Sequence, residues 1–189
     1  MRVRVITPPD PVVTWEDADA QMKLSGDESD KPYVEGLIAA ATAHIDGPDG
    51  WLGRALGLQT LEARFCGYDV GRYVRLPYPP FVQLMSVSYL DASGATLPVA
   101  LDELDSFGAD LAPLSGSWPW AGAALRREAV RVQYVAGYQG DIPAPVRVAI
   151  LMMVADMYRN RVTTQAGAQS VVPMSTKVED LLSTFRVYR

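Results

Sequence analysis

The sequence predicts an α+β protein: a small, mainly α-helical bundle with an antiparallel β insertion between its N-terminal and C-terminal helices. Near both ends of the chain, apolar residues recur every three or four positions, as in an amphipathic helix. Between residues 59 and 135 they tend to alternate with polar residues, as in strands. The 189 residues are 49% apolar, which is enough for a core. We expect one domain over 1–189, with N-terminal helices at 14–58, the β insertion at 59–135, and C-terminal helices with a tail at 143–189.

Two helices are predicted in the N-terminal part. Thr14 followed by Asp17 matches a capping box, so the first helix should run from Trp15 to about Leu24. Asp30 stands at a capping position for the second helix, which should end at the segment 47–50. The inward face of this second helix is predicted from its apolar spacing to consist of Tyr33, Leu37, Ile38, Ala41 and Ile45.

The β insertion is predicted from runs that alternate or are rich in β-branched and aromatic residues. These runs are 59–68, 72–76, 82–90, 96–101 and 129–135. Asp91 to Gly94 has the composition of a hairpin turn. The stretch from Asp102 to Trp120 has a weak pattern, and we expect a loop with one short strand there.

The C-terminal part returns to helix. Pro143 and Pro145 suit a first helical turn, and from Val146 to about Arg161 the residues are apolar nearly all round. Such a helix is buried on several sides, either in one core or between subunits. Ser175 should cap a final helix that runs through Leu182.

Residue types that commonly form disulfides, bind metal ions or act in catalysis are scarce in this sequence. Cys66 and His44 are the single cysteine and histidine of the sequence, so an intramolecular disulfide is impossible and a Cys–His zinc site is not expected. Asp102, Glu103 and Asp105 form an acidic group in a region that reads as an exposed turn. We therefore predict no catalytic residue, no cofactor site and no metal site.

Charge and hydropathy exclude further classes. The net charge of −5 argues against a general DNA-binding protein, which needs a basic surface. Residues 1–58 carry −5, residues 59–135 carry −2 and residues 136–189 carry +2. This gradient fits an ordinary solvated surface, or ends that meet different partners. The longest apolar run, Val148 to Ala155, is too short to span a membrane, so we expect no membrane partner.

Two features point to contacts between chains. Arg159 and Arg161 end the apolar helix, where they complement its dipole or pair with acids of a neighbouring subunit. Phe185, Val187 and Tyr188 place apolar groups in the C-terminal segment, which is usually polar. We expect this segment to dock, either on the body of its own chain or on a partner.

Three segments together carry a family resemblance. They are Leu76 to Val87 with Tyr89, Leu90, Asp91 and Gly94; Val132 to Tyr138 with Ile142, Pro143 and the helix to Arg161; and Leu181 and Leu182 with Tyr188 and Arg189. In this order the sequence resembles the head–tail connector (adaptor) proteins of long-tailed bacteriophages, prophages and gene transfer agents.

The resemblance implies a structural protein of the virion neck, assembled in the bacterial host cytoplasm and without catalytic activity. Such proteins form a ring, typically a dodecamer, between the portal and a stopper or head-closure protein. DNA passes through the lumen without sequence-specific binding. The resemblance assigns docking on the portal to Phe185, Arg186, Val187, Tyr188 and Arg189.

A ring also needs side-to-side contacts between copies. The apolar helix is the candidate for them, through Ile150, Met153, Met157, Tyr158, Arg159 and Arg161. Other readings stay open at this point: another neck or tail-completion ring such as a stopper, an enzyme with a carboxylate site, or a nucleic-acid-binding regulator.

Overall fold

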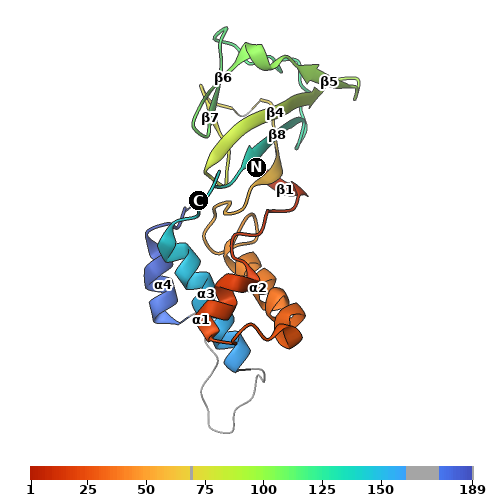
Figure 1. Ribbon diagram of the computed structural model, residues 1–189. Helices are drawn as coiled ribbons and strands as arrows, with labels where there is room; N and C mark the ends of the chain where they lie inside the picture. The colour runs from red at the N-terminus through yellow and green to blue at the C-terminus, as the bar shows by residue number, and fades with distance from the viewer. Residues whose placement is uncertain (69, 161–174, 189) are drawn as a thin grey trace, which may run out of the picture. The chain divides into compact units, whose positions relative to one another are not determined.

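The computed structural model describes residues 1–68, 70–160 and 175–188 (Figure 1). The chain divides into two compact units. We call the first the sheet unit; it comprises Met1–Asp10 and Arg54–Gln139. The second, the helical unit, comprises Pro11–Gly53 and Gly140–Arg189.

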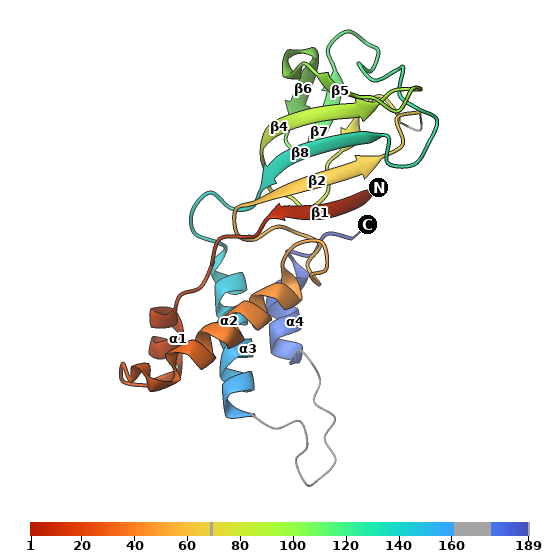
Figure 2. The same ribbon diagram turned by 90° about the vertical axis from the view of Figure 1, so that its right-hand side faces the viewer.

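The sheet unit contains two antiparallel sheets (Figure 2). The larger has the order β1 (Arg2–Thr7), β2 (Gln59–Phe65), β8 (Val130–Ala136), β4 (Phe81–Leu90) and β5 (Thr96–Val99). The smaller has the order β3 (Val74–Arg75), β7 (Asp110–Pro113) and β6 (Leu104–Phe107). Every strand pair in both sheets is antiparallel. Short connections join β4 to β5 and β6 to β7, whereas the other pairs bring together strands that lie far apart in the sequence.

Alternation along the central strands builds the core of the sheet unit. On β2, Leu61, Ala63 and Phe65 are buried, and the register sets Leu61 opposite Tyr134 of β8. The Tyr134 hydroxyl donates a hydrogen bond to the Pro77 carbonyl oxygen at 2.6 Å, which satisfies its polar end inside the core. The strands predicted at 59–68 and 129–135 are confirmed as β2 and β8. β8 buries every second residue, and β2 does the same except that Glu62 is buried as well.

The prediction of a mainly helical bundle is wrong. The described residues form eight strands in two sheets and four α-helices. β1 was missed because six residues with two arginines carry a weak signal alone; they become a strand by pairing with β2. The weak stretch after Asp102 holds two strands rather than one, because β6 and β7 form a hairpin around Gly108, whose φ is +57°.

The helical unit is organised around one central helix. Its helices are α1 (Trp15–Met22), α2 (Lys31–Ile45), α3 (Ala144–Arg159) and α4 (Thr176–Ser183). Helices α1, α2 and α4 all contact α3. This explains why α3 is apolar on most sides, as the sequence indicated. Among the described residues, no helix combines the length and the apolar character needed to cross a membrane.

The predicted N-cap residues are confirmed at three helix starts, and two of them form side-chain capping hydrogen bonds. Thr14 and Asp17 form the capping box of α1, and the Ser175 hydroxyl accepts a hydrogen bond from the Val178 N–H of α4. Asp30 is the N-cap residue of α2, but its side chain makes no capping hydrogen bond to this helix. It accepts a hydrogen bond from the Tyr158 hydroxyl instead.

The inward face of α2 differs slightly from its prediction. Its buried residues are Val34, Ile38, Ala41 and Ile45. Tyr33 was expected to face inward but is 40% exposed, and the neighbouring Val34 is buried instead. Leu37 is half-buried. A tyrosine at the rim keeps its hydroxyl near water, whereas valine places no polar atom in the core.

Candidate functional site

The C-terminal segment docks on its own helical unit. The Val187 N–H donates a hydrogen bond to the Leu52 carbonyl oxygen at 2.8 Å. Leu52 is fully buried and lies in the loop that follows α2. Of the two docking alternatives drawn from the sequence, the structure therefore shows contact with the body of the same chain.

A cation–π contact holds the same segment. The Arg186 guanidinium carbon lies 4.1 Å from the centre of the Trp51 ring and 5.0 Å from that of the Tyr188 ring. Arginine over an aromatic face is attracted by the negative face of the ring. Phe185 and Val187 are half-buried, whereas Tyr188 is 77% exposed. Arg189 lies outside the described residues. The docked segment thus presents one aromatic side chain to solvent.

Gly53 makes room for this contact. A Cβ atom at Gly53 would lie 2.7 Å from the Val187 carbonyl oxygen, and the φ of Gly53 is +63°. Both the close approach and the left-handed conformation favour glycine over any other residue. The roles of Trp51 and Gly53 were not predicted from the sequence. Their signal was a lone Gly-Trp-Leu-Gly run, whose role depends on a segment more than 130 positions away.

The residues expected between subunits lie at different depths. Ile150 and Met153 are buried inside the helical unit by the chain itself. Met157 and Tyr158 are half-buried, and Arg159 is exposed. Arg161 lies outside the described residues. Among these candidates, therefore, the residues of the C-terminal turn of α3 are the ones that reach the surface.

Two polar contacts join α3 to the N-terminal part of the helical unit. The Tyr158 hydroxyl donates to the Asp30 carboxylate, and the Arg147 guanidinium donates to the Asp17 carboxylate. Partial burial raises the pKa of Asp17, but hydrogen bonds from the Thr14 N–H and Arg147 outweigh it and hold that pKa below its ordinary value. Asp17, the N3 residue of the capping box of α1, is thereby also an ion-pair partner of α3.

The sheet unit carries a charged network on β2 and β8. The Arg64 Nε donates to a Glu62 carboxylate oxygen at 2.6 Å, and the Gln133 amide donates to the other at 3.0 Å. Burial raises the pKa of Glu62, and these two hydrogen bonds lower it by more, so the net pKa lies below the ordinary value. An ionised and fully partnered carboxylate is a structural group rather than an acid poised for proton transfer.

The residues considered as catalytic or metal-binding candidates belong to different elements of the fold. His44 is exposed in the last turn of α2, and Cys66 is half-buried directly after β2. Asp102, Glu103 and Asp105 are exposed, as expected. Within the described residues, no group of three or more His, Cys, Asp or Glu side chains is arranged to hold a metal ion.

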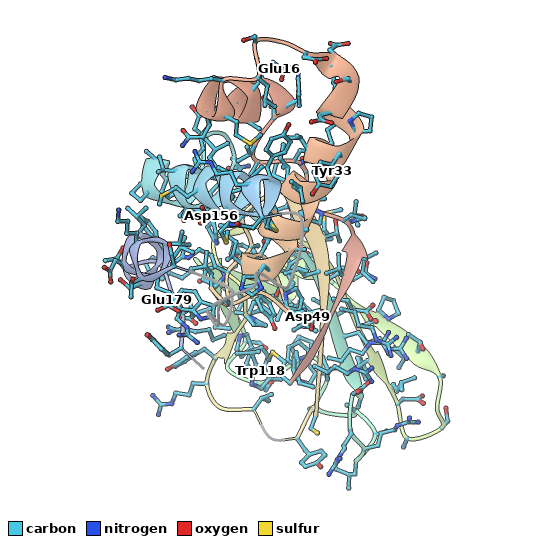
Figure 3. All side chains as sticks on the ribbon, turned by 90° about the horizontal axis from the view of Figure 1, so that it is seen from below. Glu16, Tyr33, Asp49, Trp118, Asp156 and Glu179 are labelled. Carbon is cyan, nitrogen blue, oxygen red and sulfur yellow. The ribbon has the colours of Figure 1, made fainter. Side chains whose placement is uncertain are left out.

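The net charge of the chain resides in one unit. The sheet unit has 9 basic and 9 acidic residues, whereas the helical unit has 8 basic and 13 acidic residues. Its acids are spread over several helices: Glu16 on α1, Asp156 on α3 and Glu179 on α4 are all exposed (Figure 3). Both ends of the gradient along the sequence lie in this unit, because residues 11–53 carry −7 and residues 140–189 carry +2.

Comparisons with known proteins identify the fold. No model of a known protein family matches the sequence, and no curated protein matches it either. Solved structures do. A chain in the neck of an empty gene transfer agent (GTA) particle, computed with C6 symmetry, has a TM-score of 0.77 and 20% identity. A chain in the virion of a native GTA particle has a TM-score of 0.76 and 19% identity. A chain in the neck of a native GTA particle, computed with C12 symmetry, has a TM-score of 0.69 and 20% identity.

Each match covers 100% of this chain and 97% of the other. The chain has the fold of these GTA particle proteins. The resemblance drawn from the sequence is thereby confirmed at the level of the fold, while the mainly helical description attached to it is not. Both units take part in the match, because it extends over the whole chain.

Proposed function

We propose that this chain is a structural protein of the neck of a phage-like particle, where copies of it form a ring between head and tail. The observation that carries this proposal is the end-to-end match with chains of GTA particles, two of them from necks computed with C6 and C12 symmetry. Rotational symmetry of this kind describes identical copies arranged around an axis, as in closed rings. The role needs geometry rather than catalytic groups.

Within the neck we assign the chain to the connector (adaptor) ring, a dodecamer that contacts the portal on one side and a stopper or head-closure protein on the other. The assignment rests on the sequence resemblance to connectors. The strongly acidic helical unit is compatible with a lumen that DNA crosses without sticking, because a negative wall repels phosphates. A stopper or tail-completion ring is the second candidate, since the GTA neck structures are compatible with either position.

The docked C-terminal segment is our candidate contact with the portal. A backbone hydrogen bond to Leu52 and the cation–π contact of Arg186 with Trp51 hold the segment in place. The Tyr188 side chain remains 77% exposed and is therefore accessible to a partner. Exposed aromatic and arginine side chains are the groups most enriched at energetically important interface positions. Residues Phe185 to Arg189 are accordingly assigned to portal docking.

The side-to-side contact is assigned to the end of α3. Met157 and Tyr158 are half-buried and Arg159 is exposed, which supports this assignment, and Arg161 follows them in the sequence. Ile150 and Met153 support this surface from inside the helical unit. An acidic helical unit in the next copy supplies carboxylates for these arginines.

Particle assembly tests the proposal. Cells that lack the protein should accumulate filled heads and separate tails, visible by electron microscopy. Deletion of residues 185–189 should give the same result, while the variant Tyr188→Phe should keep the tails attached. Normal tailed particles without the protein would refute the neck assignment. Normal tailed particles with the shortened protein would refute portal docking alone.

A further inference from the structure

The sheet unit has four edge strands, and two of them are protected. β5 carries Pro98, which cannot donate a hydrogen bond to a neighbouring strand, and β3 is only two residues long. β1 and β6 are the remaining edges of the two sheets. Neither contains a proline or a break within its hydrogen-bonded stretch of four residues. These two edges are therefore open to a further strand.

The edge at β1 is basic. Residues Arg2–Val5 pair regularly with β2, and a bulge follows at Ile6. Arg2 and Arg4 are exposed. Arg2 contacts Glu128 at 3.5 Å, whereas Arg4 has no ion-pair or hydrogen-bond partner among the residues that the structure describes. One cation on this edge is thus available to another chain.

The edge at β6 is acidic. Asp105 is exposed and, in the described part of the chain, has no hydrogen-bond or ion-pair partner for its carboxylate. Asp102 and Glu103 precede it, and both are exposed. Phe107 closes the strand with 87% of its surface exposed. The edge therefore combines unpaired carboxylates with an apolar side chain that the chain itself leaves uncovered.

We propose that β1 of one copy adds to β6 of the next copy, so that sheets run continuously between neighbours in the assembly. The proposal rests on the proposed function, because it supposes that copies form a ring. Strand addition supplies main-chain hydrogen bonds, and the charges select the pairing. Two β1 edges would set arginine against arginine, and two β6 edges would set aspartate against aspartate. Only the mixed pairing brings Arg4 to Asp105.

The positions of β1 and β6 in the sheet unit are compatible with strand addition that repeats from one copy to the next. Figures 1 and 2 show β1 and β6 at opposite ends of the sheet unit. A contact between two different edges is heterologous, so each copy uses one edge for each of its two neighbours. Such contacts make a closed ring when the rotation between copies divides a full turn evenly. The occupant of each edge is thus a second copy of this chain.

Charge reversal tests the pairing in assembled particles. Arg4→Asp and Asp105→Arg should each reduce incorporation of the protein into particles at least tenfold. The double variant should recover most of the incorporation, because the ion pair is restored in reverse. Arg72→Asp, an exposed arginine in the loop before β3, is the matched control and should behave as wild type. If the double variant is as poor as the two single variants, strand addition in this register is refuted.

Cross-linking separates this inference from the proposed function. In a Cys66→Ser background, Arg4→Cys and Asp105→Cys are introduced together, and purified particles and the concentrated protein are treated with a short thiol-reactive linker. A ladder of multimers should form with the pair, and at most a dimer with either cysteine alone. Protein present in necks without a ladder would refute the pairing and leave the ring in place. Protein absent from necks, with no ladder at high concentration, would refute both.

Discussion

The Val187 N–H donates a hydrogen bond to the Leu52 carbonyl oxygen at 2.8 Å, and the chain passes directly over Gly53 as it does so. Two segments far apart in the sequence are thereby joined through their backbones. A backbone contact depends little on which side chains flank it, but it depends strongly on the absence of a side chain at Gly53. This makes Gly53 the most informative single position for the docked C-terminal segment.

Gly53→Ala should loosen the C-terminal segment. The new Cβ would lie 2.7 Å from the Val187 carbonyl oxygen, and alanine would have to adopt a φ of +63°. We expect the free energy of unfolding to fall by about 1–3 kcal/mol. Hydrogen exchange at the Val187 amide should accelerate as its bond to Leu52 is lost, and denaturant unfolding measures the loss of stability.

Gly26→Ala is the control for this effect. Gly26 has a φ of +73° in the same unit, but nothing lies within 4 Å of its added Cβ. It should therefore cost stability through backbone strain alone and leave the exchange of Val187 unchanged. Equal effects of the two substitutions on Val187 would contradict the packing argument.

Arg186→Ala should weaken the same segment by a smaller amount. The guanidinium carbon lies 4.1 Å from the centre of the Trp51 ring, and such contacts at exposed sites contribute about 0.5–1 kcal/mol. Exchange of the Val187 amide should then rise about twofold to fivefold. Arg186→Lys should keep part of the protection, because a cation remains over the ring. No change with alanine would show that the contact adds nothing to docking.

Asp17→Asn should alter the acid stability of the helical unit. The pKa of Asp17 is lowered in the folded protein, so its contribution is present above its unfolded pKa of about 3.9 and disappears as the pH falls through the lower folded value. At pH 7 the variant should be less stable by about 1 kcal/mol. The difference between the two proteins should begin to shrink below about pH 4 and vanish once the pH is below the folded pKa of Asp17. Asp156→Asn, which removes an exposed carboxylate of α3, is the control and should cost less stability at pH 7, because the ion pair of Asp17 with Arg147 stays intact. Melting temperatures measured between pH 2 and 7 check this.

Trp120 should tolerate phenylalanine better than alanine. It is fully buried, stacks on Trp118 with ring centres 4.4 Å apart, and meets the Phe65 ring edge-on at 5.9 Å. Trp120→Ala should cost about 3–5 kcal/mol. Among the described residues its indole N–H has no hydrogen-bond partner, so Trp120→Phe loses no hydrogen bond and should cost less. Equal losses in urea unfolding would contradict this.

Trp118→Phe is the matched comparison for Trp120→Phe. The Trp118 indole N–H donates to the Gly71 carbonyl oxygen at 2.8 Å, so this substitution removes a hydrogen bond. The loss should be about 1 kcal/mol beyond the change in packing.

Local signals explain which elements the sequence predicted well. The capping box of Thr14 and Asp17 and the cap at Ser175 were found because a cap is encoded within four residues. The alternation on β2 and β8 was found because each strand has a buried and a less buried face.

Distant contacts explain what the sequence did not predict. β1 depends on pairing with β2, whose first residue lies 52 positions after Thr7. Trp120 sits in a stretch with turn residues on both sides, so its place in the core could not be read from its neighbours. The contact of Gly53 with Val187 likewise joins segments that carry no common pattern.

The division of the chain into two units has a consequence for dissecting the protein. The chain passes between the units three times, after Asp10, after Gly53 and after Gln139. Trimming the N-terminus removes β1 from the sheet unit, and trimming the C-terminus removes α4 from the helical unit. Neither unit can be obtained by a single truncation. Joining Gly53 directly to Gly140 by a short linker would excise most of the sheet unit, which makes an internal deletion the natural way to assign separate tasks to the two halves.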